Sequence, residues 1–314
     1  MKKKIDISVV IPVYGCDETL IELYSQLTDI LRGIVKSYEI IFIDDCAGEN
    51  SWEIIKKISA NDSFASGLKL SRNFGQHAAI SAGIDRSRGD YTVVMDCDLQ
   101  DNPKEIINFY NESRKGYHIV VGRRKNRQDG FFVKLTSKMF YKVFNYFSEQ
   151  KINYEIANYG IYSRDAINAV KKYKEKDRSF GLLMTLVGFS RTEIDIKHLR
   201  RASGVSSYNF RSRINMAIGH ILSHSNKPLL LAVKVGFVCT FGAIIYSIWL
   251  IISFLNSGSP PDGWTSIIVS MFFLSGLILS VIGVVGIYIG KIYNEVKDRP
   301  LYIIDKFSKE DNGK

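Results

Sequence analysis

The first two hundred residues alternate between short apolar runs and segments with helical spacing. Apolar runs of roughly four to eight residues bounded by turn residues are typical of strands, whereas apolar residues three and four apart are typical of helices. The predicted strands cover 7–13, 38–44, 66–71, 91–96, 117–122, 156–162 and 192–198, and the predicted helices cover 17–35, 51–60, 75–87, 102–115 and 163–175. This alternation predicts an α/β domain with a mostly parallel sheet, flanked by helices and binding ligands beyond the carboxyl ends of its strands.

Between residues 229 and 289 the pattern changes, because charged residues almost disappear. Two apolar stretches, 229–255 and 265–289, are each long enough to cross a hydrocarbon core that needs about 20 helical residues. The alternative is a pair of buried core helices, but apolar runs as uninterrupted as these favour membrane helices. Lys and Arg flank the pair and are absent from the connecting loop NSGSPPDGW, so the positive-inside rule predicts that both chain ends are cytoplasmic.

The net charge of +10 adds information about partners. No zinc-finger, RRM or recognition-helix signature accompanies the charge, so we expect no nucleic-acid partner and favour anionic lipids and phosphate ligands. A predicted helix over 131–147 carries Lys134, Lys138 and Lys142 four residues apart on one face. Such a stripe is either a solvated face or a surface for lipid headgroups or a lipid phosphate.

Four cysteines are present, namely Cys16, Cys46, Cys97 and Cys239. They form no CxxC pair and no spacing expected of a zinc site. The sequence therefore predicts reduced thiols in a cytosolic setting.

Candidate chemistry lies at the ends of two predicted strands. No GxGxxG and no GxxxxGK[ST] motif occurs, so a nucleotide would bind through other residues. Asp44 and Asp45 end the second strand, and Asp96-Cys97-Asp98 ends the fourth. Two carboxylates one residue apart can hold a hard divalent cation, which neutralises the charge on a departing diphosphate. Because any acidic turn matches DxD, the assignment depends on the surrounding motifs.

Those motifs are IPVYG, FIDDC, LKLSRNFGQHAAISAGI, RGDYTVVMDCDLQDNPKEI, VVGRR and the RxxGxSxY pattern of residues 201–208. In this order they resemble family 2 glycosyltransferases of the dolichyl-phosphate mannose synthase and bactoprenol glucosyltransferase group. The resemblance extends from residue 7 to residue 304 and includes the membrane part, which is similar to that of bacterial members with two spans.

The resemblance implies a GT-A fold and a role for each matching residue. The base and ribose of a nucleotide sugar would contact Pro12, Tyr14, Asp44 and Asp45. The cofactor, Mg2+ or Mn2+, would be held by Asp96, Asp98 and Gln100, with Arg72 and Asn73 near the diphosphate. Donor and acceptor phosphates would lie among Arg124, Lys134, Ser137 and Arg201, and the catalytic residues would be Asp98, Arg201 and Asn158. Alternatively, Tyr14 merely packs at a strand end, Asp44 or Asp45 caps the next helix, and the basic loop after residue 122 is solvated.

The implied activity is inverting transfer of a hexose from UDP-glucose or a similar nucleotide sugar to polyprenyl (undecaprenyl) phosphate, for cell-surface polysaccharide or glycan modification. The alternatives are a GDP-mannose-dependent polyprenyl-phosphate mannosyltransferase and a non-catalytic membrane scaffold of the same fold. A processive polysaccharide synthase is disfavoured, because the chain has no Arg-Trp pair and therefore no QxxRW motif.

The expected organisation is a cytoplasmic GT-A domain at 1–208, an amphipathic juxtamembrane helix at 209–228, two transmembrane helices at 229–290 and a cytoplasmic tail at 291–314. The protein would lie in the inner (cytoplasmic) membrane, in contact with membrane lipids. Family resemblance implies a homo-oligomer, and the GxxxG pattern of residues 286–290 permits close helix contact within or between chains.

The sequence departs from the family pattern most clearly at Asn158-Tyr159-Gly160-Ile161, where many relatives carry Asp-Phe-Arg-Leu. Asn158 cannot act as a base. Three explanations remain: the acceptor phosphate needs no base, Glu155 substitutes, or the pocket is rebuilt around a different sugar.

Overall fold

The computed structural model describes residues 4–46, 48–124, 156–176, 178–196, 225, 227–257 and 263–309. The chain forms two compact units. The first comprises Met1–Asp129, Ile152–Ser207 and Arg299–Lys314, and the second comprises Gly130–Lys151 and Tyr208–Asp298.

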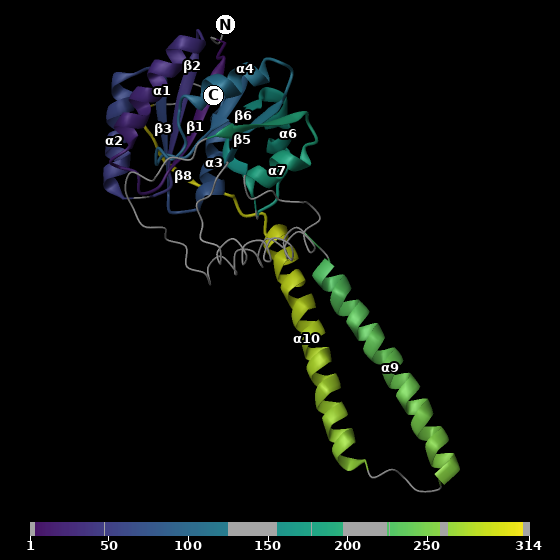
Figure 1. Ribbon diagram of the computed structural model, residues 1–314. Coiled ribbons are helices and arrows are strands. Elements are labelled where there is room, and N and C mark those ends of the chain that lie inside the picture. The colour runs from purple at the N-terminus through teal and green to yellow at the C-terminus, as the bar shows by residue number, and fades with distance from the viewer. Residues whose placement is uncertain are drawn as a thin grey trace. The chain divides into compact units, whose positions relative to one another are not determined.

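The first unit is built on an eight-stranded sheet with the order β7-β5-β6-β4-β1-β2-β3-β8 (Figure 1). Its strands are β1 (Ile7–Val13), β2 (Tyr38–Asp44), β3 (Ala65–Leu70), β4 (Tyr91–Val94), β5 (Ile119–Arg124), β6 (Ile156–Ser163), β7 (Arg191–Ile196) and β8 (Ile304–Phe307). The central strands β4, β1, β2 and β3 are parallel, and β5 pairs in parallel with β7. Antiparallel pairing occurs between β6 and its neighbours β4 and β5, and between β8 and β3. The predicted mostly parallel sheet is confirmed.

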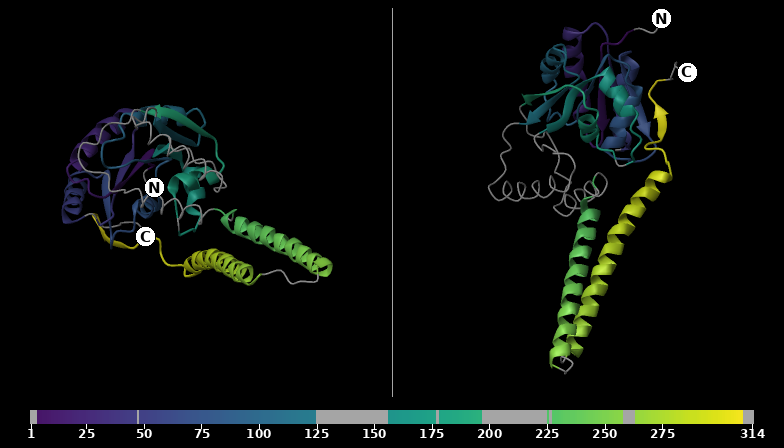
Figure 2. Two further views of the ribbon diagram at one scale, coloured as in Figure 1. Left: turned by 60° about the horizontal axis from the view of Figure 1, so that its bottom comes forward. Right: turned by 90° about the vertical axis from the view of Figure 1, so that its right-hand side faces the viewer.

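Helices pack on both faces of this sheet (Figure 2). One core contains apolar side chains of α1 (Leu20–Ile34), α2 (Glu49–Asn61) and α4 (Glu105–Ser113), and the other contains those of α3 (Gln76–Arg86), α6 (Arg164–Lys171) and α7 (Phe180–Leu186). Consecutive residues of β1 alternate between them, because side chains alternate faces along a strand. Burial on both faces explains why the central strands are continuous apolar runs.

The C-terminal segment adds the edge strand β8 to the sheet of the first unit. The Ser308 amide donates to the Gly67 carbonyl at 2.9 Å, and the Ser71 amide donates to the Ile303 carbonyl at 2.9 Å. The Tyr302 hydroxyl donates to Asp85 Oδ2 at 2.7 Å. The sequence of this tail predicts no secondary structure, because its four strand residues gain hydrogen-bond partners only when they reach the edge of β3.

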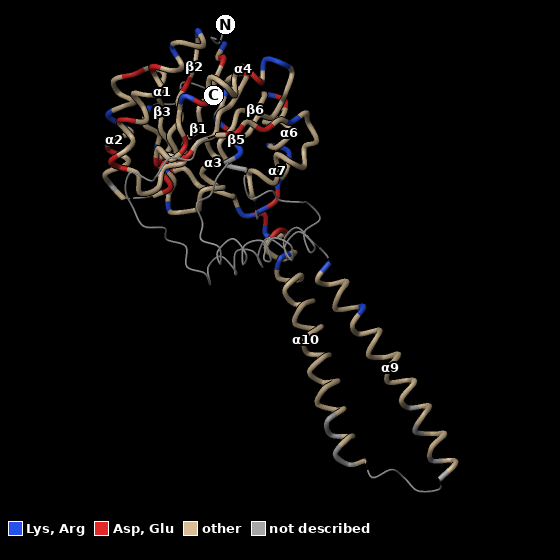
Figure 3. Tube along the Cα trace, viewed as in Figure 1, with Lys and Arg blue, Asp and Glu red and all other residues tan. Residues whose placement is uncertain are grey.

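The second unit contains two long helices, α9 (Lys227–Ser257) and α10 (Trp264–Val296). Both are long and apolar enough to cross a membrane, with mean hydropathies of 2.2 over Lys227–Ser253 and 2.4 over Ser270–Val296. Neither apolar window is buried within the described structure, which does not support the alternative of core helices. Charged residues are frequent along the first unit and sparse along these helices, as Figure 3 shows.

A tight polar corner precedes β4. The Glu39 carboxylate, which is 5% exposed, accepts hydrogen bonds from Ser8 Oγ at 2.6 Å and from the Arg88 amide at 2.7 Å. The adjacent Gly89 amide donates to Ser8 Oγ at 2.7 Å. A Cβ atom at Gly89 would lie 2.6 Å from the Ser8 amide nitrogen and 2.7 Å from the Tyr91 carbonyl oxygen. Both are backbone atoms of paired strands, so neither can move alone.

Replacing Gly89 by Ala should therefore lower the free energy of unfolding by about 1–3 kcal/mol, the usual cost of overpacking. Thermal unfolding of the detergent-solubilised full chain would measure the change. Gly33→Ala is the matched control, because a Cβ there meets no atom within 4 Å and lies in helix α1. This control should be neutral or stabilised by up to about 1 kcal/mol. Equal stability of the Gly89 variant and the wild type would contradict the steric argument.

Candidate functional site

The Asp96-Cys97-Asp98 turn follows β4. Asp96 and Asp98 are half-buried, whereas Cys97 between them is buried. Asp98 Oδ1 accepts a hydrogen bond from the Gln100 amide at 3.1 Å, and Leu99 adopts a left-handed φ of 57° that reverses the chain. The two carboxylates and the half-buried Gln100 therefore lie along one turn at the carboxyl end of a central strand.

The donor set of this turn fits a hard divalent cation. Among the described residues no group of three or more His, Cys, Asp and Glu side chains gathers as a metal cluster. The turn carries two carboxylates and the Gln100 side-chain amide, and the remaining ligands of a cation there would be water and phosphate oxygens. This is how Mg2+ is usually held beside a phosphorylated substrate.

Asp44 and Asp45 lie at the carboxyl end of β2, where both are buried. Asp45 holds the loop that leads into α3, because its two oxygens accept hydrogen bonds from the Phe74 and Gly75 amides at 2.7 and 2.8 Å. Burial raises the pKa of the Asp45 carboxyl, and these two amides act against that rise. Asp45 therefore supports the start of α3, not the next helix α2, and its role toward a ligand stays a prediction.

The loop of residues 71–75 carries Arg72 and Asn73, both exposed. The Arg72 guanidinium lies over the Phe74 ring, 4.1 Å from its centroid, and donates to the Asn73 carbonyl at 3.2 Å. Asp45 holds the Phe74–Gly75 end of this loop. Arg72 is therefore anchored at the same end of the sheet as the Asp96-Cys97-Asp98 turn, called the acidic turn below.

Gln76, the first residue of α3, was not among the predicted site residues. Its Nε2 donates to Asp96 Oδ1 at 2.6 Å. The signal in the sequence was its position in the SRNFGQ segment, three residues after Asn73. This bond connects the start of α3, next to the loop that Asp45 holds, with the acidic turn.

The end of β1 faces the same turn. Pro12 is buried and Tyr14 is 62% exposed, so the Tyr14 ring is accessible rather than packed at the strand end. Cys16 forms a disulfide with Cys97, and their Cα atoms are 6.0 Å apart. The Thr19 hydroxyl donates to the Cys97 carbonyl at 2.7 Å, and the Thr19 amide donates to the Cys16 carbonyl at 3.0 Å.

The prediction that all four cysteines are reduced thiols is wrong for this pair, while Cys46 and Cys239 are free. Cys16 and Cys97 are 81 residues apart in the sequence, and their spacing carries no signal of pairing. They meet because β1 and β4 are parallel neighbours whose carboxyl ends lie side by side.

Asn158 lies on β6, the antiparallel neighbour of β4. Val94, the last residue of β4, pairs with Gly160, two residues after Asn158. A Cβ atom at Gly160 would lie 2.5 Å from the Val120 carbonyl oxygen, which leaves no space there for the Arg of many relatives. The Tyr159 hydroxyl donates to the Asn102 carbonyl at 2.8 Å, which fixes the strand beside the acidic loop.

The remaining predicted residues are described only in part or not at all. Arg124 ends β5, but its side chain is outside the described structure. Lys134, Ser137, Glu155 and Arg201 lie outside the described residues.

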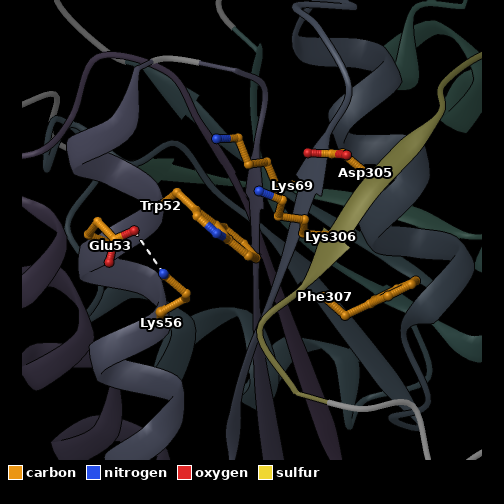
Figure 4. A pocket seen from close by; sticks show the side chains of 7 residues that line it. All are labelled: Trp52, Glu53, Lys56, Lys69, Asp305, Lys306 and Phe307. Atoms are coloured by element: carbon orange, nitrogen blue, oxygen red, sulfur yellow. Dashed lines mark ion pairs between the residues drawn. The ribbon is translucent and has the colours of Figure 1, made fainter.

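A hollow of about 480 Å3 lies at the edge of the sheet, between α2 and the strands β3 and β8 (Figure 4). Lys69 and Lys306 line it, together with the Glu53–Lys56 ion pair at 2.7 Å. None of the predicted site residues lines this hollow. The hollow therefore lies outside the group of strand ends described above.

Comparisons with known proteins identify the family of the chain. The model of the family described as Glycosyl transferase family 2 matches residues 8–171. An uncharacterized glycosyltransferase of Bacillus subtilis, YkcC, is 33% identical over 307 residues, covering 98% of this chain and 95% of that protein. The SfII prophage-derived bactoprenol glucosyl transferase of Shigella flexneri is 32% identical over 301 residues, covering 96% of this chain and 97% of that protein.

Among solved structures, glucosyl-3-phosphoglycerate synthase from Mycobacterium tuberculosis, in complex with Mn2+, UDP and glucosyl-3-phosphoglycerate, shares the fold. Its TM-score is 0.50 at 13% identity, covering 69% of this chain and 78% of that one. This likeness agrees with the GT-A fold expected from the sequence. The protein described here belongs to glycosyl transferase family 2.

Proposed function

We propose that the protein transfers a hexose, from UDP-glucose or a similar nucleotide sugar, to polyprenyl (undecaprenyl) phosphate with inversion at the anomeric carbon. The observation that carries the proposal is the 32% identity to a bactoprenol glucosyl transferase over 96% of the chain, which includes both apolar helices. The acidic turn suits a diphosphate-bearing donor. The two apolar helices suit an acceptor that is a membrane lipid. Its product would serve cell-surface polysaccharide or glycan modification.

On the donor side, Asp96, Asp98 and Gln100 would hold Mg2+ or Mn2+, which stabilises the charge on the departing diphosphate. The exposed Tyr14 ring would pack against the base, and Pro12, Asp44 and Asp45 would shape the base and ribose pocket. Arg72 and Asn73, on the loop that Asp45 anchors, lie at the end of the sheet where the diphosphate would lie.

On the acceptor side, Arg124, Lys134, Ser137 and Arg201 would surround the lipid phosphate, since Arg offers paired donors to phosphate oxygens. A phosphate monoester has a second pKa of about 6 and is largely ionised near neutral pH. Its oxygen can attack without a protein base, which agrees with a neutral Asn at position 158. Catalysis then depends on positioning and on charge stabilisation.

The membrane arrangement belongs to the same proposal. The domain at 1–208 and the tail at 291–314 would be cytoplasmic, 209–228 would lie along the inner (cytoplasmic) membrane, and 229–290 would span it twice. The charge asymmetry around the spans supports this orientation. A homo-oligomer could form through the small residues of 286–290.

The sugar and the turnover are tested together by incubating purified protein with undecaprenyl phosphate, Mg2+ and a panel of labelled UDP- and GDP-sugars. We expect labelled lipid from a UDP-hexose. Label from GDP-mannose alone would favour the mannosyltransferase, and no labelled lipid from any donor would favour the non-catalytic scaffold and refute the enzyme proposal.

Asp98→Ala should lower transfer about 100-fold or more, because loss of a carboxylate ligand removes several kcal/mol of charge stabilisation. Asn158→Ala should lower transfer less, because no proton moves through Asn158. Initial rates of lipid labelling, with membrane insertion checked by fractionation, would measure both. Full activity of the Asp98 variant would refute the cation site, and equal losses would give Asn158 a central role.

A further inference from the structure

The hydrogen bond between Gln76 and Asp96 joins α3 to the acidic turn. Its N···O distance is 2.6 Å, and the donor is the first residue of an 11-residue helix. Asp96 accepts this bond through Oδ1, so α3 restrains the orientation of a carboxylate that follows β4.

The helix that carries Gln76 is itself firmly held. Residues 78–84 of α3 are buried against the sheet, in contact with β1 and β2. At the N-terminus, Asp45 accepts the amides of Phe74 and Gly75, the two residues before Gln76. The backbone from which the Gln76 side chain extends is therefore held in place on both sides.

We propose that Gln76 is a positioning residue that holds Asp96 in the orientation required by the divalent cation of the donor complex. The proposal rests on the proposed function only in requiring that a cation binds at the acidic turn. Groups that orient a metal's carboxylate ligand typically change metal affinity or activity 10- to 100-fold when they are removed. A neutral amide suits the position, since Lys would add a competing positive charge and Glu would repel Asp96.

The proposal is tested by titrating the detergent-solubilised protein with Mn2+ in the presence of UDP. Binding is measured as the loss of the EPR signal of free Mn2+. Gln76→Ala and Gln76→Met both remove the donor, and Met keeps the side-chain length. Each should weaken Mn2+ binding about 10-fold. Gln26→Ala is the matched control, because Gln26 Nε2 donates to the Glu22 carboxylate at 2.9 Å on the exposed side of α1. It should bind Mn2+ like the wild type.

Wild-type Mn2+ affinity in the Gln76→Met variant would overturn the proposal, and so would a wild-type protein that binds no Mn2+ with UDP. Failure of lipid transfer in a wild type that binds Mn2+ and UDP would refute the proposed function alone. Thermal unfolding of each variant separates lost positioning from lost folding.

The link between Cys16 and Cys97 is a separate feature of the same site. Cys97 stands between the two carboxylates, and Cys16 follows the β1 end that carries Tyr14. The Thr19 amide donates to the Cys16 carbonyl at 3.0 Å and the Thr19 hydroxyl donates to the Cys97 carbonyl at 2.7 Å, so hydrogen bonds keep the two backbones together independently of the S–S bond. The thiols of the reduced protein would therefore remain neighbours.

We infer that Cys16 and Cys97 form a reversible thiol–disulfide pair that, when oxidised, cross-links the loop after β1, which carries Tyr14, to the acidic turn of Asp96-Cys97-Asp98. The oxidant would be a low-molecular-weight disulfide such as oxidised glutathione. One cysteine thiolate attacks it and releases one thiol, and the second cysteine then attacks the mixed disulfide and releases the other. Two cysteine thiols are oxidised, and one disulfide is reduced to two thiols.

The cross-linked form should bind UDP with Mn2+ about threefold more tightly than the reduced form, because a restrained loop loses less freedom on binding. Calorimetry after oxidised glutathione or dithiothreitol treatment measures this, and peptide mapping identifies the linked cysteines. Cys16→Ser should show one affinity under both treatments. Absence of the 16–97 link after oxidation, or equal affinities of the two wild-type forms, would overturn the inference.

Discussion

Strand β1 pairs in parallel with β2 on one side and with β4 on the other, and the candidate site depends on this pairing. Parallel strands end at the same edge of a sheet, so the residues after each strand become neighbours whatever their distance in sequence. The acids after β2, the Tyr14 loop after β1 and the acidic turn after β4 are collected in this way. The apolar side chains on both faces of the three strands supply the free energy that holds the edge together.

Around this edge, the loop before α3 contributes as much to the site as the strand ends do. Asp45 uses both carboxylate oxygens to hold the loop, and Gln76 at its end reaches Asp96. The acids therefore differ in role. Asp45 is buried and accepts hydrogen bonds from backbone amides, whereas Asp96 and Asp98 are half-buried on their turn. Partial exposure matters, because a cation must reach the carboxylates together with its water and phosphate ligands.

The Asn158 segment also follows from packing. Gly160 sits where strands β4, β6 and β5 are adjacent, and the nearby Val120 carbonyl leaves no space for a side chain. A side chain at this position would require the strands to separate. A neutral Asn158 is chemically acceptable when the attacking group is an already ionised phosphate.

Features that depend on a local pattern could be predicted from the sequence. Runs such as 7–13 and 38–44 predicted the central strands, the hydropathy of 229–289 predicted the two long apolar helices, and DCD marked the acidic turn, because each signal lies within a few consecutive residues. Tertiary structure alone decided the Cys16–Cys97 pairing, the bond from Gln76 to Asp96 and the addition of β8 to β3. Those contacts join residues 20 to more than 200 positions apart, and a short segment such as 304–307 carries no pattern that specifies a partner so distant.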